Sequence, residues 1–510
     1  VLEGERANSD GALSFEGNER TSLFGKLFAH PTAALTVTVA ANGQWQRGRI
    51  ASGATRDQIA AFGPGFGLTN DLRQQNAAPF NGDRFHTDFA YASLRWAGRT
   101  LTVEATPYTY GLYRRFANGL DVNGETPNGT AFGAGDLPGQ QAFNDLRASG
   151  GVLRAERRWR MLSLRAGIWA EHQINSRGQF EIDQTLGGRL NPVLDPVPGV
   201  PGSAAIDRLQ RDSLDTQQPY LEAEWRPLPG LSVTPGLRWA FAERHVAAPV
   251  MEGTRLPTFG DATYDDPLPS VAVRQRLGEH WSGYAQLAQG SLAPPLQLLD
   301  TTRPLGDVSG EKTLNMQVGA VRHGTDWSLG LDGYVIQFDD LVNTREIGGE
   351  TLAFTSGGAT YEGVEAEATI GLGFGLSLYG NASLSRARDH DTGAPLPNAP
   401  DQTLAGGILF SRGPWSASLL DKWVGSRWGD TGRQAGLDPF NQLDLAVVRT
   451  IRLPGIGSGT GEVLRLALQA QNLADSRKIV ALAGYTVADG TPLWFTQPGR
   501  SFFGTVTATF

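Results

Sequence analysis

The chain has 510 residues, no cysteine and a formal net charge of −8. The lack of cysteine excludes disulfides, thiolate metal sites and a cysteine nucleophile, and the negative charge disfavours a nucleic-acid-binding surface, which needs a basic face. No apolar run approaches the roughly 20 residues of a membrane-spanning helix. A transmembrane β-barrel remains compatible, because only every second residue of each strand faces lipid.

The predicted elements are long strands with period-2 alternation of apolar and polar residues. Leu221, Ala223 and Trp225, for example, alternate with charged or polar neighbours. In chain order we count 19 spans, near residues 20–30, 35–47, 84–96, 101–117, 149–160, 163–176, 217–228, 231–245, 267–277, 280–290, 312–323, 326–342, 359–371, 375–386, 402–412, 415–426, 441–453, 462–475 and 501–510.

The connections between these spans alternate between short and long, as they do at the two rims of bacterial outer-membrane barrels. Short turns are predicted near 30–34, 97–100, 160–162, 228–231, 278–280, 323–326, 372–375, 412–415 and 453–461. Long loops rich in Gly, Pro and Asp are predicted near 48–83, 118–148, 177–216, 246–266, 290–311, 387–401, 427–440 and 477–500. The pattern predicts an all-β, transmembrane antiparallel barrel.

The span count is odd, whereas single-chain bacterial barrels have an even number of strands. The first counted span ends in a short turn, so it descends from the long-loop rim. Residues Val1–Glu19 read as loop. We therefore expect a further span upstream of this chain.

Alternation also assigns the two faces of the barrel wall. The outward face is predicted to carry Leu378, Leu384, Leu466, Leu468, Val506 and Phe510. The inward face is predicted to carry Glu224, Tyr379, Asn381, Arg465 and Gln469. Tryptophans near span ends, which suit a membrane interface, are Trp96, Trp159, Trp225, Trp239, Trp281, Trp327 and Trp415.

Candidate chemistry is sparse. Residues Arg388–Asp391 place two carboxylates beside an imidazole, but the side chains are consecutive and do not converge as metal ligands do. Glu365 and Glu367 share a strand face with Glu362 opposite, which fits a polar lumen wall better than paired acid–base catalysis. No Gly-x-Ser-x-Gly elbow and no P-loop occurs. We predict no catalytic residue, no metal site and no cofactor.

Several ordered motifs resemble those of one family. The chain ends in a strand, Ser501–Phe510, with a C-terminal Phe, preceded by Gln497-Pro-Gly-Arg500 and by Gln471-Asn-Leu-Ala-Asp475. Tyr361–Glu367 reads Y-x-G-V-E, and Pro397–Pro400, then Trp423–Ser426, follow it in order. This set resembles the barrel of TonB-dependent outer-membrane receptors of the siderophore type over roughly residues 20–510, with Ala474 where the family usually has Phe.

The resemblance implies a plugged barrel of 22 strands. On that basis residues 1–510 are expected to be the barrel domain with about 19 of the 22 strands, the plug and first strands lying outside this chain. The implied function is energised uptake of a bulky nutrient, a ferric siderophore or similar iron complex, across a Gram-negative outer membrane. The expected partners are a ferric chelate, outer-membrane lipid and the TonB complex, which is reached through the plug.

Two other functions remain open, a passive porin-like channel and a barrel-embedded hydrolase. A serine and a histidine presented together would favour the hydrolase. For the receptor, aromatic and arginine side chains near outer strand ends and loops would suit an anionic, partly aromatic chelate. The predicted ligand-binding residues are Tyr108, Tyr110, Arg114, Arg115, Arg303, Arg427, Trp428 and Trp494.

Overall fold

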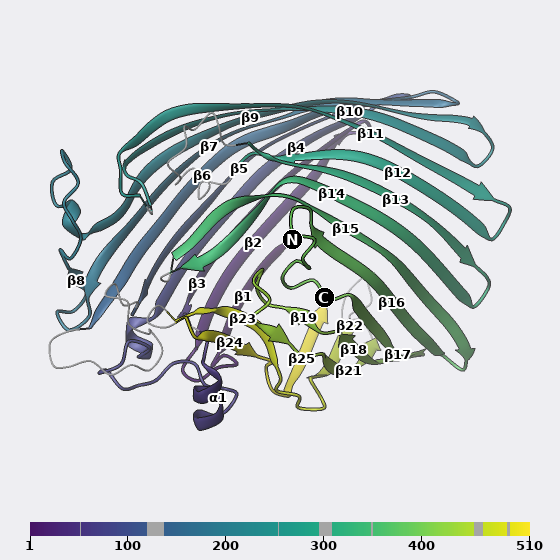
Figure 1. Ribbon diagram of the computed structural model, residues 1–510. Helices are drawn as coiled ribbons and strands as arrows, with labels where there is room; N and C mark the ends of the chain where they lie inside the picture. The colour runs from purple at the N-terminus through teal and green to yellow at the C-terminus, as the bar shows by residue number, and fades with distance from the viewer. Residues whose placement is uncertain are drawn as a thin grey trace.

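The structure is a computed structural model that describes residues 1–51, 53–119, 137–252, 254–294, 309–347, 350–452, 463–486 and 490–509. Strands dominate it (Figure 1). Its helices are α1 (Arg56–Phe62) and two single 3-10 turns, η1 (Ala78–Phe80) and η2 (Ser203–Ala205). Across these described ranges, no helix combines the length and the hydropathy needed to cross a bilayer.

The long strands follow one another as neighbours in space. They are β1 (Leu2–Ser9), β2 (Asn18–Thr32), β3 (Leu35–Arg49), β4 (Gly82–Ala97), β5 (Leu101–Asn118), β6 (Pro138–Arg158), β7 (Leu162–Asp183), β9 (Ile206–Leu228), β10 (Leu231–Val250), β11 (Thr258–Leu277), β12 (Trp281–Leu292), β13 (Glu311–His323), β14 (Trp327–Ile347), β15 (Glu350–Gly373), β16 (Leu376–Asp389), β17 (Gln402–Arg412), β18 (Trp415–Val424), β21 (Phe440–Arg452), β22 (Val463–Gln471) and β25 (Ser501–Thr509).

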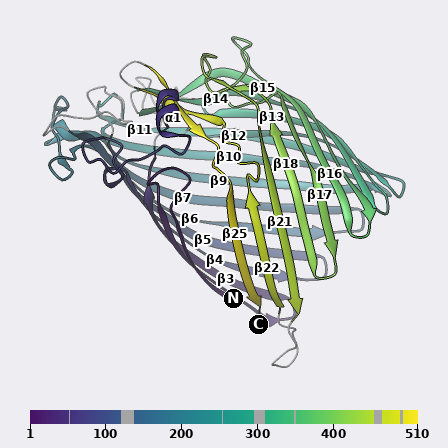
Figure 2. The ribbon, with the colours of Figure 1, turned by 90° about the horizontal axis from the view of Figure 1, so that it is seen from below.

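Together with the two-residue β8 (Arg189–Leu190), these strands form a single sheet of 21 strands among the described residues, and every pairing in it is antiparallel. The sheet curls around so that the two chain ends lie next to each other in both ribbon views (Figures 1 and 2). Its edge strands are β1 and β25, and the described residues make no ladder between them. All 19 predicted spans are confirmed as strands of this sheet.

The prediction that Val1–Glu19 is loop was wrong. Residues Leu2–Ser9 form β1, which pairs with β2. The segment carries charges on both faces and has no apolar alternation, so no pattern revealed it. An ion pair of 2.6 Å between Glu5 and Arg20 joins it to its neighbour. Charged side chains are typical of edge strands, where they discourage unwanted pairing. Among the described residues, the long strands of the sheet therefore number 20, one more than the 19 predicted.

Several predicted long loops are shorter than expected, because the strands continue past the apolar band. β6 starts at Pro138, β7 ends at Asp183 and β9 starts at Ile206. These extensions carry polar residues on both faces and therefore lack the alternation that marks a lipid-facing strand. The remaining loops hold α1 and two small hairpins, β19 (Arg427–Trp428) with β20 (Gly436–Leu437), and β23 (Ile479–Tyr485) with β24 (Pro492–Thr496).

The predicted short turns are confirmed at one rim of the sheet, where Figure 1 shows tight hairpins at the right. The turn predicted at 453–461 lies outside the described residues. Gly230, with φ of 79°, and Gly278, with φ of 77°, adopt the left-handed conformation that such turns require. Short turns at one rim leave the longer loops at the other, as predicted.

The two faces of the wall differ in chemistry. Leu94, Leu153 and Ile168 are exposed apolar side chains in one continuous cross-strand row. In the adjacent cross-strand row, Glu104 and Arg154 lie opposite each other and form an ion pair of 2.6 Å. A barrel wall has an apolar face toward lipid and a polar face toward the lumen. We therefore assign the first row to the outside and the ion pair to the lumen.

The same register confirms the alternation predicted elsewhere. The side chains of Leu378, Leu384, Leu466, Leu468 and Val506 are exposed. Tyr379 lies on the other face, where its hydroxyl donates to Glu367 at 3.2 Å, and Glu224 faces Arg165 at 3.3 Å. Phe510 lies outside the described residues.

Tryptophans mark the short-turn end of the outward face. The Arg322 guanidinium lies 5.1 Å from the ring centroids of both Trp281 and Trp327, and Arg449 lies 5.1 Å from that of Trp415. These cation–π contacts hold cationic and aromatic groups together at the level expected for an interfacial girdle. These tryptophans mark the membrane interface at the short-turn end, from which the heights of other residues on the wall can be counted.

Candidate ligand-binding site in the lumen

Aromatic side chains gather on the lumen face of β4, β5 and β7. The Tyr108 ring centroid lies 6.2 Å from that of Tyr110 and 6.4 Å from that of Phe89, which lies 5.7 Å from Tyr91. The Trp169 indole N–H donates to the Tyr108 hydroxyl at 2.5 Å. We call these five residues the inner aromatic cluster. It brings together the predicted residues Tyr108 and Tyr110 with three that the sequence did not single out.

Glu171 fixes the hydroxyl ends of the cluster. The Tyr108 hydroxyl donates to one carboxylate oxygen at 2.6 Å and the Tyr110 hydroxyl to the other at 3.1 Å. Tyr108 reaches across β6 because the residue between it and Glu171 is Gly150. A Cβ atom at Gly150 would lie 2.8 Å from the Tyr108 hydroxyl oxygen. The glycine thus keeps open the path between two strands that are not direct neighbours.

The predicted residues Arg114 and Arg115 are consecutive in the sequence but lie on opposite faces of the wall. Arg114 faces the lumen, where it forms a bidentate contact with Asp83 at 3.1 and 2.9 Å and stacks 5.0 Å over the Phe116 ring. Arg115 lies on the outward face, opposite Arg84 and Phe143. The prediction that both arginines serve one vestibule was wrong, because consecutive strand residues point to opposite faces.

Three predicted residues belong to a packed assembly of loops, while Arg303 lies outside the described residues. Trp494 is 5 % exposed and packs with Ala435 and Leu437. The Arg56 guanidinium lies 4.8 Å over its ring. Trp428, on β19, accepts a hydrogen bond at its carbonyl from the Asn398 N–H at 2.7 Å. These contacts hold the outer loops together.

Arg427 also joins two of the outer loops. Its guanidinium donates to the Val480 carbonyl and lies 5.3 Å from the Phe440 ring centroid. Burial lowers the pKa of this guanidinium below its ordinary value. Arg427, Trp428 and Trp494 thus join loops far apart in the chain, whereas Tyr108 and Tyr110 line the wall.

A buried polar network lies beyond the aromatic cluster, on the outer extensions of β7 and β9. Glu252 pairs with Arg177 at 3.3 Å and also with Arg208. Arg208 donates to the Gln179 side chain at 3.1 Å, and Gln179 donates to Asp207 at 2.8 Å. Buried charges require such partners. No sequence pattern predicts this network, because its members come from distant segments that only the fold brings together.

The motif around residues 471–475 ties the last long loop to the final strand. The buried Asn472 side chain donates to the carbonyls of Ser476 and Pro498, both at 2.7 Å. Asp475 accepts from the Arg500 N–H at 2.8 Å and from the Arg477 guanidinium at 3.2 Å. These contacts, the Arg500 N–H first, lower the pKa of the Asp475 carboxyl. The motif residues therefore position β25.

The glycine of the Y-x-G-V-E motif also has a packing reason. A Cβ atom at Gly363 would lie 2.7 Å from the Tyr334 hydroxyl and 2.8 Å from the Leu384 carbonyl oxygen. Tyr361 packs against Phe338 with ring centroids 5.4 Å apart. The glycine thus leaves room for the Tyr334 side chain to lie across β15.

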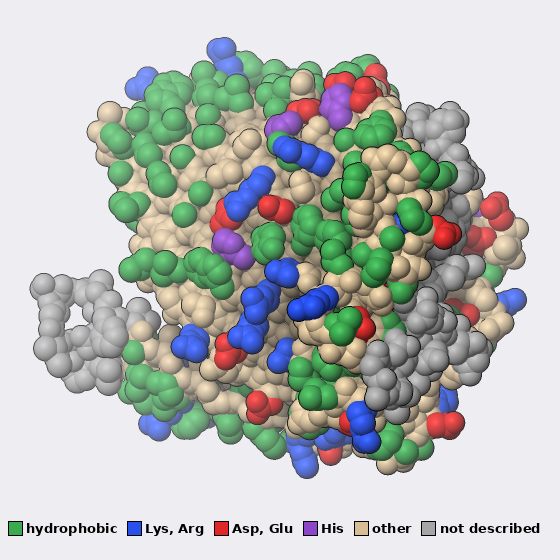
Figure 3. Space-filling view, turned by 90° about the vertical axis from the view of Figure 1, so that its left-hand side faces the viewer, with side chains coloured by type: hydrophobic (Ala, Val, Ile, Leu, Met, Phe, Trp, Pro, Cys, Tyr) green, Lys and Arg blue, Asp and Glu red, His purple; other side chains and the backbone are tan. Residues whose placement is uncertain are grey.

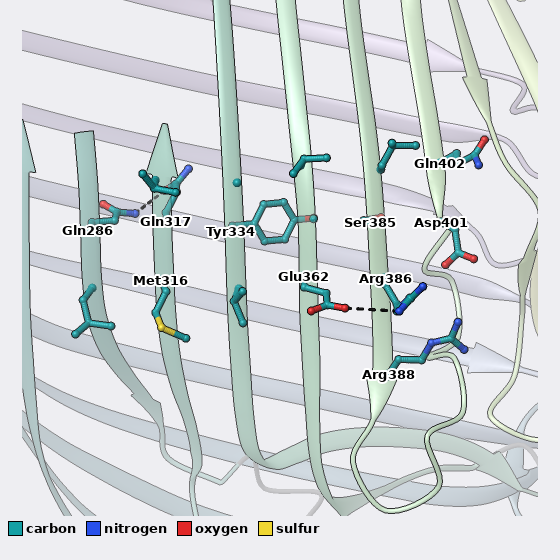
Figure 4. A pocket seen from close by; sticks show the side chains of 17 residues that line it. Gln286, Met316, Gln317, Tyr334, Glu362, Ser385, Arg386, Arg388, Asp401 and Gln402 are labelled. Atoms are coloured by element: carbon teal, nitrogen blue, oxygen red, sulfur yellow. Dashed lines mark hydrogen bonds and ion pairs between the residues drawn. The ribbon is translucent and has the colours of Figure 1, made fainter. Parts of the chain in front are cut away.

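A pocket formed by described residues lies elsewhere, across β12–β17 (Figure 4). Its volume is 1060 Å³. Val318, Val364 and Leu384 line it in one cross-strand row with Gly333, and all three side chains are exposed. This row belongs to the outward face. The pocket is therefore a depression in the lipid-facing wall and not part of the lumen site.

In the described ranges, no serine hydroxyl is hydrogen-bonded to a histidine ring, and no group of three or more His, Asp or Glu side chains is placed to hold a metal ion. His172 and His245 instead contact Asp215 and Asp261 on the outward face.

Comparison with known proteins gives the same architecture. Residues 28–473 match the family model described as TonB dependent receptor-like, beta-barrel. No curated protein sequence matches the chain.

Solved structures share the fold at low sequence identity. The ferric citrate transporter FecA, in its unliganded form, has a TM-score of 0.77 and 14% identity, covering 100% of this chain and 73% of that chain. The ferric yersiniabactin uptake receptor FyuA from Yersinia pestis has a TM-score of 0.75 and 15% sequence identity. The match covers 100% of this chain and 74% of that chain. The copper transporter OprC has a TM-score of 0.74 and 16% sequence identity. The match covers 100% of this chain and 75% of that chain.

Proposed function

The chain belongs to the TonB dependent receptor-like β-barrel family, and from this premise we propose that it is an outer-membrane receptor for energised uptake of a ferric siderophore or similar iron complex. The family is one of transporters and receptors rather than enzymes. Uptake then requires binding and gating without covalent chemistry.

The inner aromatic cluster is the observation that supports this ligand class most directly. Its rings, joined through Glu171, present a broad apolar and hydrogen-bonding surface on the lumen wall. Such a surface suits a bulky chelate that offers both ring faces and polar edges. Two structural relatives are named for ferric complexes and one for copper, which supports a metal complex as the cargo.

The structure changes which residues we propose for the ligand. Tyr108, Tyr110 and Trp169 would form the main contact, with Phe89 extending it. Arg114 would contribute only if its pair with Asp83 reorganised. Arg115 is excluded from this site because it faces outward. Arg427, Trp428 and Trp494 would act by holding the outer loops together.

Binding of defined chelates to the purified protein tests this proposal. The 12 tryptophans provide a fluorescence signal that a bound iron complex should quench. Ferric citrate, a ferric catecholate and a ferric hydroxamate would be compared with their iron-free forms, cobalamin and a maltooligosaccharide. Saturable quenching by one ferric complex alone is the expected result. Tight binding of cobalamin or the sugar, without response to any ferric chelate, would overturn the proposal.

A further inference from the structure

Three arginines stand in one row on the outward face. Arg47 on β3 lies directly opposite Arg84 on β4, and Arg84 lies directly opposite Arg115 on β5. All three side chains are exposed. They share the alternation of Trp96 and Leu94, so they point away from the lumen. We call Arg47, Arg84 and Arg115 the arginine row.

The charge of this row is not balanced within the described part of the chain. None of the three guanidinium groups forms an ion pair with a described carboxylate. Glu19 lies opposite Arg47 in the register but makes no ion pair with it. The nearby Asp88 pairs with Arg147 at 2.8 Å. Like charges directly opposite each other destabilise a sheet, so this row favours an external anion.

The height of the row follows from the strand register. Leu35 pairs with Trp96 at the short-turn end, and Trp45 pairs with His86 ten residues further along β4. Ten residues span about 34 Å along a strand, or about 24 Å across the membrane at a tilt of about 45°. This distance matches the apolar band of about 25 Å.

Aromatic side chains mark the outer edge of that band. The Trp45 and His86 rings stack at 5.1 Å with an interplanar angle of 11°, and Tyr113 lies opposite His86. The arginine row comes two residues beyond this girdle, which is about 5 Å further from the membrane centre. That height is the headgroup level of the outer leaflet.

On the face of the molecule that lies at the left in Figure 1, Lys and Arg side chains lie next to areas of hydrophobic side chains (Figure 3). An arginine offers two parallel N–H donors to phosphate oxygens. Three in a row present six such donors at one level, with aromatic rings beneath to contact the first part of an acyl chain or sugar.

We propose that the arginine row, with Trp45, His86 and Tyr113 beneath it, binds the phosphorylated headgroup of an outer-leaflet lipid. The inference rests on the proposed outer-membrane location but not on the cargo. The bound lipid neutralises the row and anchors β3–β5 at the membrane surface. The geometry assigns this surface to a lipid and not to nutrient, because it faces away from the lumen.

The test measures lipid binding by native mass spectrometry of the detergent-purified full protein. The probes are bisphosphorylated lipid A, its dephosphorylated form and inorganic phosphate. The triple variant Arg47→Gln, Arg84→Gln, Arg115→Gln should bind bisphosphorylated lipid A weaker by on the order of tenfold to a hundredfold. Its affinity for dephosphorylated lipid A should change little.

Two further variants keep the outcome interpretable. Replacing the three arginines by Lys retains the charge and should restore part of the affinity. Replacing Arg95, Arg238 and Arg274 by Gln removes equal charge from the lumen face and should leave lipid A binding unchanged. Each variant is first checked for folding by its heat-dependent gel mobility.

An unchanged lipid A affinity in the Gln variant would overturn the inference. Equal loss in the lumen control would also overturn it, as would saturation of the row by inorganic phosphate with no preference for the lipid. Because ferric chelates are absent from this assay, its failure is separate from failure of the proposed uptake function. Loss of chelate binding with retained lipid A binding would contradict only the proposed uptake function.

Discussion

Tyr108 shows how one side chain connects strand register to the proposed function. It lies on β5, accepts from Trp169 and donates to Glu171 on β7 across a glycine of β6. The cluster therefore depends on a small residue at one position as much as on the rings. A rigid hydrogen-bonded set of rings is pre-organised for a ligand, which lowers the entropy lost on binding.

Replacing Tyr108 and Trp169 by Leu should therefore weaken binding of the cognate ferric chelate by at least about tenfold, because each bound ring contributes about a kcal/mol or more. Isothermal titration with the purified variant measures this. The matched control is Tyr284→Leu, which removes a tyrosine–carboxylate contact of 2.6 Å to Asp332 on another part of the wall. Equal losses in both variants would refute a specific role for the cluster.

Asn472 provides a residue-scale test of stability. Its amide nitrogen bonds to two carbonyl oxygens in a site that is 3 % exposed, and its φ is 48°. Asn472→Ala leaves both carbonyls without this donor and places alanine in the left-handed region. The expected loss is about 2–4 kcal/mol of unfolding free energy, measured by urea unfolding in detergent. Asn381→Ala, in the lumen wall, should cost much less.

At the scale of the element, alternation made the strands predictable. Each of the 19 predicted spans lies on a strand of the sheet, and the described short-turn ends of these strands agree with the prediction to within about two residues. β1 was missed because it carries Glu3, Glu5 and Arg6 with no apolar stripe. The outer parts of β6, β7 and β9 were missed for the same reason, since polar side chains occupy both of their faces and form hydrogen bonds with one another there.

The candidate site was only partly predictable. Tyr108 and Tyr110 stand two residues apart on one predicted strand, so their shared face followed from the pattern. Trp169 lies about 60 residues away by sequence, and only strand register brings it to Tyr108. Trp494 was read as a loop residue open to ligand, but three loops pack around it. The residue pattern within one strand cannot predict such contacts between distant segments.

The face assignment is tested on β22. Leu468 is 57 % exposed on the outward face and Gln469 is on the lumen face. Leu468→Arg should destabilise folding into lipid vesicles by about 2–4 kcal/mol, because the charge enters the apolar band. Gln469→Arg should have a small effect, since the lumen is wet. A larger cost for the Gln469 variant would mean that the two faces are reversed.

At the scale of the whole molecule, the curled sheet encloses a lumen wider than side chains can fill, since they fill only barrels of about eight strands. The lumen wall carries ion pairs such as Glu104–Arg154, which fits contact with water or with another polar surface. We propose that gated import requires a plug domain inside this wall, in keeping with the family.

Residues 1–510 produced alone are accordingly predicted to conduct ions when inserted in planar bilayers. Unpaired strand edges are costly in lipid, so insertion should be inefficient, but inserted molecules should give large and noisy conductance. Addition of a plug domain should lower that conductance. Correctly inserted residues 1–510 that conduct no ions would show that the wall alone closes the lumen.

Energy-dependent uptake is the most direct test of the central claim that this barrel belongs to an active receptor for a metal complex. Cells producing the protein from its native gene would be given the radiolabelled ferric chelate that quenches its fluorescence, with and without an ionophore that collapses the proton gradient. We predict saturable uptake that stops when the gradient is lost. Uptake that rises linearly with concentration and is unaffected by the ionophore would contradict it and indicate a passive channel.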